Sequence, residues 1–480
     1  MNRRMIFSTL GRLLIAISAL LILPIVVSIY FKEKCTAAFL ITAAISLTIG
    51  LLLYFIFRTK NHVIYAREGF AITALVWLSM SFVGSLPFVI SGEIPSFVDA
   101  FFETASGFTT TGASILRDVE SMSRGLLFWR SFTHWIGGMG VLVFVMALLP
   151  NISDRSIHLL RAESAGPIVG KLVPKLKDSA RILYIVYIGL TLLEIIMLLA
   201  GGMPVFDSVV HAFGTAGTGG FGIKADSIAS YSPYLQWVIA IFMLLFGVNF
   251  NLYFMILLRK FKAFFTNKEL WCYVGIVILS VVAICINIYP LYENFAEVIR
   301  TSVFQVSSII TTTGYATADF NLWPEFSKGL LVVLMFVGGC AGSTAGGLKV
   351  SRVMLLFKIM AREVRRLIHP RSVSSVKLEG KSVEEGVVSS VSTYFAVYMA
   401  IIISTFLVLS LEPFGFETNF TATISCVNNI GPGLAGVGPA ASYADYSAIS
   451  KIMLSIAMLL GRLEIYPLLL VFMPSLWKKD

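Results

Sequence analysis

The sequence TTTGAS at Thr109–Ser114 returns in nearly the same form as TTTGYA at Thr311–Ala316. Two further glycine-rich segments lie at a similar spacing along the chain, namely GTGGFG at Gly217–Gly222 and IGPG at Ile430–Gly433. The four segments lie roughly 100 residues apart, and self-similarity at a fixed period is the signature of a repeat architecture. The chain is therefore expected to contain four related structural units.

Long apolar blocks surround these segments. The chain is 57% hydrophobic and only 13% charged, whereas soluble domains carry about 25% charged residues. The apolar residues gather in long blocks, namely Leu13–Tyr30, Ala37–Phe57, Ile182–Ala200, Val274–Ile288 and Val387–Leu411. A block of about 18 apolar residues is enough to cross a bilayer as a helix. Because barrel strands would be about 10 residues long, we expect an all-α membrane protein with about ten transmembrane helices.

The formal net charge of +10 is distributed in a way that predicts the topology. Lys and Arg gather in every second loop, for example in Arg58–Arg67, Arg259–Lys268 and Lys358–Lys381. Basic loops stay on the cytoplasmic side, so both termini are expected to be cytoplasmic and the number of spans even. The same topology explains the basic balance, and no nucleic-acid partner is expected.

Each glycine-rich segment follows a short apolar stretch such as Phe97–Phe108. About 12 residues make a helix of about 18 Å, near half of the bilayer core, so it must re-enter rather than span. The chain then returns as non-helical backbone, which is tolerated only against protein or a water-filled path. Glycine lets successive carbonyls point the same way, and carbonyl oxygens can replace the hydration shell of K⁺. The alternative is that the glycines only let helices pack closely.

The predicted cation filter takes residues from all four segments: Thr110, Thr111, Gly112, Thr218, Gly219, Thr312, Thr313, Gly314, Asn429, Ile430 and Gly431. The threonines can add hydroxyl oxygens below the carbonyls. In the second segment both Gly217 and Gly219 fit the position of Gly112, so the register stays open there.

This fourfold pattern resembles the Trk/Ktr/HKT superfamily of cation transporters, which has one helix–pore-helix–filter–helix unit per repeat. The extra N-terminal hairpin is similar to that of its TrkH-type members, and Gly112 matches the potassium-selective ones. The resemblance implies uptake of K⁺ across the bacterial inner membrane by a multi-pass homodimer with one pore per subunit. It also implies a cytoplasmic TrkA-like nucleotide-binding ring as regulator. K⁺ at the filter would be the substrate, and no bound organic cofactor is expected.

The repeats divide the chain into five predicted parts. These are an N-terminal hairpin at residues 1–66, followed by pore repeats at residues 67–155, 156–262, 263–366 and 367–480.

A second glycine-rich run, VGGCAGSTAGGLK at Val337–Lys349, lies in the second helix of repeat three. Glycine costs about 1 kcal/mol per site relative to alanine in a helix, so the helix is expected to break here. The run either lets helices pack closely or forms a flexible loop under the filter, and the resemblance implies an intramembrane gating loop. The predicted gate residues are Gly338, Gly339, Gly342, Ser343, Thr344, Gly346, Gly347 and, from repeat four, Arg462.

Arg462 is a charge inside an apolar helix and is a functional candidate for that reason. It either opposes cations beside the pore, as the resemblance implies, or forms a structural ion pair with Glu464 or another carboxylate. Arg130 and His134 are weaker candidates, expected near the outer interface where a long side chain can reach water.

Two rival functions need residues that the chain supplies poorly. A membrane enzyme would need a cluster of acids or histidines near one interface, and no such constellation is found, so no enzymatic activity is predicted. An ion-coupled carrier for Na⁺ or H⁺ would need a carboxylate at mid-membrane, for which Glu194 is the one obvious candidate.

Overall fold

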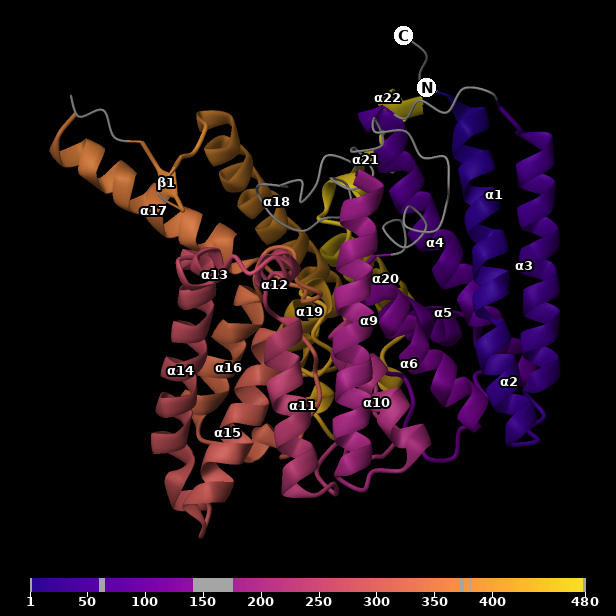
Figure 1. The fold of residues 1–480 in the computed structure, drawn as a ribbon, viewed down its shortest axis with the longest axis horizontal. Coiled ribbons are helices and arrows are strands. Elements are labelled where there is room, and N and C mark those ends of the chain that lie inside the picture. Colours follow the sequence, from indigo (N-terminus) through magenta and orange to yellow (C-terminus); the bar gives the residue numbers. More distant parts are fainter. Residues whose placement is uncertain (1, 60–64, 141–175, 371–374, 380, 478–480) are drawn as a thin grey trace.

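The computed structural model describes the chain except residues 1, 60–64, 141–175, 371–374, 380 and 478–480. The described part is a bundle of helices with one short ribbon of two antiparallel strands, β1 (Lys377–Leu378) and β2 (Lys381–Ser382) (Figure 1). The boundary predicted between the first two repeats, at residues 155–156, lies outside the described residues, and the limits of the repeats stay a prediction.

The chain begins with a helical hairpin of α1 (Arg3–Leu20), α2 (Ile22–Tyr30) and α3 (Thr36–Ile56). Its two arms cross at two glycines. A Cβ on Gly11 would lie 2.7 Å from the Gly50 carbonyl oxygen, and one on Gly50 would lie 2.9 Å from that of Gly11. Small residues at such a crossing let membrane helices approach closely.

Four short, buried helices form the centre, each preceded by a long helix. The long helices are α4 (Ala66–Ser91), α9 (Leu176–Ala200), α14 (Lys268–Ile288) and α18 (Glu385–Leu409). The short ones, called pore helices below, are α5 (Phe97–Phe108), α10 (Val205–Gly217), α15 (Phe295–Ile310) and α19 (Phe416–Val427).

The first pore helix is followed by α6 (Arg124–Gly138). The helices that follow the other three pore helices are interrupted. They are the pair α11 (Pro233–Phe246) and α12 (Phe250–Leu257), the pair α16 (Glu325–Val337) and α17 (Val350–Ile368), and the pair α20 (Ala448–Arg462) and α21 (Tyr466–Val471). Short connecting elements complete the described chain: α13 (Phe261–Phe265), α22 (Pro474–Trp477), and the 3-10 turns η2 (Tyr289–Leu291), η3 (Phe320–Leu322), η4 (Ala435–Val437) and η5 (Tyr443–Asp445).

These interruptions bear on the number of spans. Within the described ranges, six helices are long and apolar enough to cross a bilayer, or seven if α11 and α12, bent by 91°, count as one. The all-α membrane architecture agrees with the prediction from the sequence, but the count of about ten spans is not confirmed.

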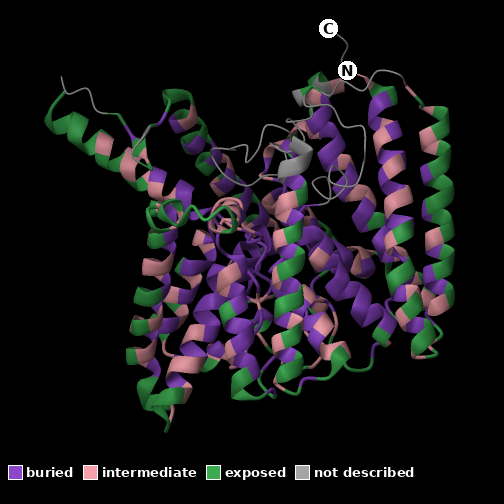
Figure 2. Cartoon of the chain, viewed as in Figure 1, coloured by how far each residue is buried: buried purple, intermediate pink, exposed green. Residues whose placement is uncertain are grey.

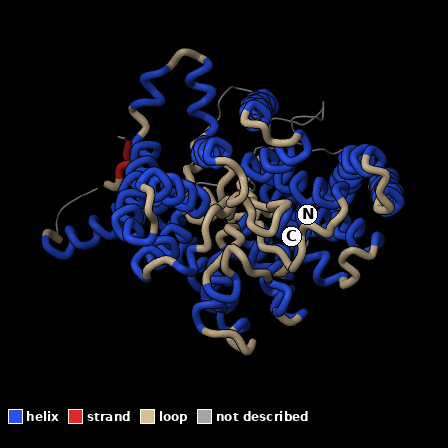
Figure 3. The backbone as a smooth tube through the Cα atoms, turned by 90° about the horizontal axis from the view of Figure 1, so that it is seen from below, coloured by secondary structure: helices blue, strands red, loops and turns tan. Residues whose placement is uncertain are grey.

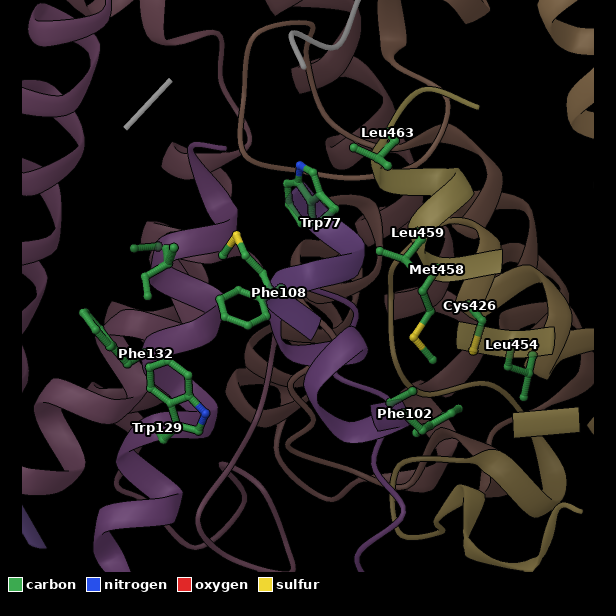
Figure 4. Close-up of a cluster of buried hydrophobic side chains, with 14 of the residues drawn as sticks. Trp77, Phe102, Phe108, Trp129, Phe132, Cys426, Leu454, Met458, Leu459 and Leu463 are labelled. Atoms are coloured by element: carbon green, nitrogen blue, oxygen red, sulfur yellow. The ribbon is translucent and has the colours of Figure 1, made fainter. Parts of the chain in front are cut away.

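Burial follows the layers of the bundle. Seen along the bundle, the loops gather in the middle and the helices surround them (Figure 3). The centre is buried, and large apolar side chains are exposed along the outer helices (Figure 2), for example Leu52, Leu193, Leu279 and Ile403. An apolar outer surface of this extent is typical of contact with lipid. Inside, Phe102 and Phe108 of α5 pack in one cluster with Trp129 of α6 and Met458 of α20 (Figure 4).

Candidate functional site

All four pore helices end in the same backbone geometry. One or two residues beyond the end of each pore helix, a residue with a side chain is left-handed, with φ of 55° at Thr110, 55° at Thr218, 57° at Thr312 and 57° at Asn429. The next N–H reaches back five residues, as in Thr111 N to Ser106 O (2.8 Å) and Gly219 N to Gly214 O (2.8 Å). This is the Schellman ending of a helix, normally made with glycine. A left-handed residue with a side chain costs about 1 to 3 kcal/mol, so its use in all four units points to a functional constraint.

The same geometry settles the register of the second repeat. Two residues after each left-handed Thr or Asn comes a glycine with positive φ: Gly112 (80°), Gly220 (76°), Gly314 (83°) and Gly431 (101°). Gly220, rather than Gly217 or Gly219, therefore occupies the position of Gly112. The sequence alignment was wrong because it matched the Thr–Gly pair of the second segment to the Thr–Gly pair of the first. In the structure, Thr218 corresponds to Thr110 and Gly219 to Thr111.

The four glycines and the four preceding carbonyls close into a ring. A Cβ added to Gly112 would collide with the carbonyl oxygen of Gly219 in the next repeat. The relation continues around the ring, with Gly220 against the oxygen of Thr313, Gly314 against that of Ile430 and Gly431 against that of Thr111. This carbonyl ring brings together segments that lie roughly 100 residues apart in the chain, which is the geometry expected of repeats around one axis.

A cavity of about 400 Å³ opens at the ring. Its lining includes the glycine of every repeat, together with Arg117, Lys224 and Asp445 at its mouth and Arg130 in its wall. Arg117 forms an ion pair with Asp445, which lies far from it in the sequence. Of the predicted filter residues, Gly112, Gly314 and Gly431 line this cavity, called the vestibule below, together with Gly220.

Hydroxyl and amide groups brace the ring from behind. Thr109 Oγ1 and Thr111 Oγ1 share a hydrogen bond of 2.8 Å, and Thr311 repeats it with Thr313 at 2.8 Å. Asn429 Nδ2 donates to Thr111 Oγ1 (2.9 Å), which joins the fourth segment to the first. The sequence places Asn429 in the filter but does not reveal this cross-link.

The glycine run of repeat three forms a loop below the ring, since α16 ends at Val337 and α17 begins at Val350. The amide of Gly346 donates to Thr312 Oγ1 (2.6 Å), and a Cβ on Gly346 would lie 2.5 Å from the Asn428 carbonyl oxygen. The loop therefore touches the filter segments of repeats three and four.

Glu269 of α14 holds both ends of this loop, a role that the sequence did not reveal. Its Oε1 accepts hydrogen bonds from Ala341 N (2.7 Å) and Ser351 N (3.1 Å). Hydrogen bonds from two backbone N–H groups to one carboxylate are strong. Glu269 therefore holds the loop at Ala341 and Ser351, and only the residues between them are free to move.

Arg462 at the end of α20 also contacts the loop. Its guanidinium donates to the carbonyls of Thr344 (2.8 Å), Gly137 (2.5 Å) and Gly138 (2.6 Å), which ties the loop to the end of α6.

Glu464, the partner considered for Arg462 from the sequence, instead pairs with Arg352 of α17. Arg352 also lies over the Tyr394 ring, at 4.0 Å from its centroid.

The sequence predicted that Arg130 and His134 lie near the outer interface, and this prediction is wrong. They are 3% and 0% exposed. His134 Nδ1 contacts Gly107 O at 2.7 Å, and its Nε2 accepts from Phe221 N at 3.3 Å. His134 lies against Gly219 of the carbonyl ring, and Arg130 lines the cavity beside it. The signal that could have located Arg130 is its partner Glu103, which is buried on the short helix α5.

Residues 35–479 match the family model described as "TrkH: Cation transport protein". The chain belongs to the TrkH family. Among TrkH-family proteins, it is 36% identical to "Trk system potassium uptake protein TrkH" of Salmonella typhimurium and 30% identical to "Trk system potassium uptake protein TrkI" of Halomonas elongata. The alignments cover 100% of both chains for the first, and 99% of this chain and 97% of the relative for the second.

A solved TrkH-family structure gives the same result for the fold. The crystal structure of the potassium transporter TrkH from Vibrio parahaemolyticus superposes with a TM-score of 0.89 at 32% identity, covering 100% of each chain. The predicted resemblance to this family is thereby confirmed, and the chain is a multi-pass membrane protein.

The Asn429 cross-link gives a first prediction. Asn429→Ala removes the hydrogen bonds from Nδ2 to Thr111 Oγ1 and to Met458 O (2.9 Å). The free energy of unfolding should therefore fall by about 1 to 3 kcal/mol, measured by thermal unfolding of the purified protein in detergent. Ser404→Ala is the matched control, because the Ser404 hydroxyl bonds to its own helix at Ile401 O. Equal melting temperatures for the two variants would contradict the cross-link.

Proposed function

We propose that this TrkH-family protein conducts K⁺ into the cell through the carbonyl ring, across the bacterial inner membrane. The observation that carries the proposal is the closed ring in which each glycine backs onto a carbonyl oxygen of the next repeat. The relatives named above as potassium uptake proteins support the choice of ion. The function is transport, with K⁺ as the substrate.

The ring suits a cation that has lost its water. Inward-facing carbonyl oxygens replace the hydration shell of K⁺. The four pore helices end at the ring, so the negative ends of their dipoles favour a cation there. Flux would run down the electrochemical gradient, to which an inside-negative potential contributes about 2.3 kcal/mol per charge per 100 mV.

In this proposal the selective residues are those predicted from the sequence, with Gly220 added. The carbonyls of Thr111, Gly219, Thr313 and Ile430 stand at the level of the glycines, and the left-handed residues Thr110, Thr218, Thr312 and Asn429 turn the chain below them. The ring has a mixed composition, so we expect fewer ordered ion sites than in a filter of four identical TVGYG segments.

We assign the gate to the loop between α16 and α17 together with Arg462. The Gly346–Thr312 bond and the Arg462–Thr344 bond hold the loop under the filter, which is a closed arrangement. Positive φ at Gly338, Gly342 and Gly347 gives the loop turns that other residues resist. Opening requires these two bonds to break while Glu269 keeps the loop ends in place.

We also assign both termini to the cytoplasm. Arg3 donates to the Trp477 carbonyl (3.1 Å), so the two ends of the chain share one side of the bundle (Figure 1). A homodimer and a TrkA-like nucleotide-binding ring on that side remain part of the proposal, and they rest on the family resemblance.

The flux proposal predicts a loss of selectivity when the ring is crowded. Gly112→Ser or Gly314→Ser places a side chain against the carbonyl of the next repeat, so the ratio of K⁺ to Na⁺ permeability in proteoliposomes should fall about tenfold, equivalent to about 1.4 kcal/mol. Gly92→Ser is the matched control, because Gly92 has the same φ of 80° but nothing within 4 Å of an added Cβ. Unchanged selectivity in both filter variants would remove the filter assignment.

The gate assignment predicts higher flux for Arg462→Ala. The variant frees the loop from α20 and α6 without touching a ring carbonyl, so K⁺ flux per folded molecule should rise several-fold while the K⁺/Na⁺ ratio stays the same. Folded yield is measured by size exclusion. A folded variant with unaltered or lower flux would contradict the role of Arg462 in closing the pore.

A coupled carrier is the second candidate, favoured by one observation. Glu194 of α9 is fully buried, and neither of its carboxylate oxygens has a hydrogen-bond partner among the described residues. If the carboxyl carried a coupling proton, Glu194→Gln would abolish K⁺-driven H⁺ movement in proteoliposomes. For a channel-like pore we expect K⁺ flux in Glu194→Gln within about twofold of the unmodified protein, and no H⁺ movement in either.

A further inference from the structure

One buried ion pair stands directly behind the filter. Arg130 Nη2 and Glu103 Oε1 are 2.7 Å apart, and their side chains are 3% and 0% exposed. Glu103 lies on pore helix α5 and Arg130 on α6. Two charges leave water only at a high cost, which their mutual attraction often does not recover. Stability alone is therefore a weak reason for this pair.

Glu103 holds the chain that leaves the first filter segment. Its carboxylate accepts hydrogen bonds from Ser114 Oγ (2.9 Å) and from the backbone N–H of Ile115 (2.9 Å). These residues come two and three positions after Gly112, so the carboxylate fixes the outer side of the ring in repeat one.

Arg130 carries the connection to the second repeat. Its Nη1 donates to the Gly222 carbonyl (3.3 Å), and its guanidinium lies 4.0 Å from the centroid of the Phe221 ring. Phe221 and Gly222 directly follow Gly220. The ion pair thus joins the ends of two neighbouring filter segments, and Arg130 also lines the vestibule.

Repeat three uses an uncharged version of the same support. Gln305 stands nine positions before Gly314, as Glu103 does before Gly112. With its amide oxygen turned to the loop, it accepts from Thr317 N (3.0 Å) and Ala318 N (3.3 Å). A neutral side chain can therefore hold the chain after a filter segment.

Repeat four fills both positions with apolar residues. Gly137 and Gly461 correspond, since a Cβ on either would collide with the carbonyl four residues before its filter glycine. Counting back seven residues matches Arg130 with Leu454, which is 0% exposed, and the position of Glu103 is taken by Ala422. Leu454 packs beside Cys426 in the core (Figure 4). The fold accordingly tolerates uncharged residues at both positions.

We propose that Glu103 and Arg130 are positioning residues that set the spacing between the first and second filter segments and so determine how well the ring distinguishes K⁺ from Na⁺. The inference rests on the proposed function. Because the net charge of the pair is zero, it stiffens the wall of the vestibule without adding a field that repels cations. Either charge alone would change both the spacing and the field at the ring.

The test separates spacing from stability with a double variant. Glu103→Gln strands the Arg130 charge beside the vestibule, and we expect the K⁺/Na⁺ permeability ratio to fall at least tenfold, together with the folded yield. The double variant combines Glu103→Gln with Arg130→Leu. Gln is the side chain that repeat three has at the first position, and Leu is the side chain that repeat four has at the second, so no unpaired charge remains. Its yield should return to that of the unmodified protein, but its permeability ratio should stay low because the link to Gly222 is lost.

A second ion pair on the same pore helix supplies the control. Lys451 Nζ lies 2.6 Å from Asp99 Oδ1 at the start of α5, away from the ring. Asp99→Asn should leave the permeability ratio unchanged, whatever its effect on yield.

Three outcomes decide the matter. A double variant with restored yield and a normal ratio would show that the pair is only structural and would overturn the inference, with the proposed function intact. A low ratio in the double variant and a normal one in Asp99→Asn would support it. Unmodified protein that carries no K⁺ in the same liposomes would instead contradict the proposed function.

Discussion

The contact on which the rest of the structure depends is that of each filter glycine with a carbonyl oxygen of the neighbouring repeat. Because Gly112, Gly220, Gly314 and Gly431 lack side chains, the four segments approach closely enough to close a ring. The pore helices must then end abruptly, which explains the left-handed Thr110, Thr218, Thr312 and Asn429. Two threonine pairs and the Glu103–Arg130 ion pair lie behind this strained backbone, and the ion pair is the one that we propose as its support.

The same close approach bears on the loop that we propose as the gate. A loop can approach the underside of the ring this closely only if its residues there have almost no side chains. Gly346 is an example, because a Cβ on it would lie 2.5 Å from the Asn428 carbonyl oxygen. Arg462 donates to three backbone carbonyls, those of Thr344, Gly137 and Gly138. One side chain thereby binds the loop, α6 and α20 together.

The sequence allowed the architecture to be predicted, because membrane spans and repeated Thr–Gly segments are local patterns. It also located Arg462 and the broken helix at Gly338. It did not reveal that Gly220 takes the place of Gly112, since that depends on backbone angles rather than residue identity. Nor did it reveal Glu269 or Glu103: an acid in an apolar context looks like a loop residue until a distant N–H or guanidinium is folded against it. Arg130 was misplaced for the same reason.

The central claim is that the four carbonyls surround a bound cation. The most direct measurement is anomalous diffraction from crystals grown with Rb⁺ in place of K⁺. We expect a peak on the axis of the ring, close to the carbonyls of Thr111, Gly219, Thr313 and Ile430, that disappears when Na⁺ replaces Rb⁺. A well-ordered ring without such a peak, or an anomalous peak found only elsewhere in the protein, would contradict the claim that the four carbonyls surround a bound cation.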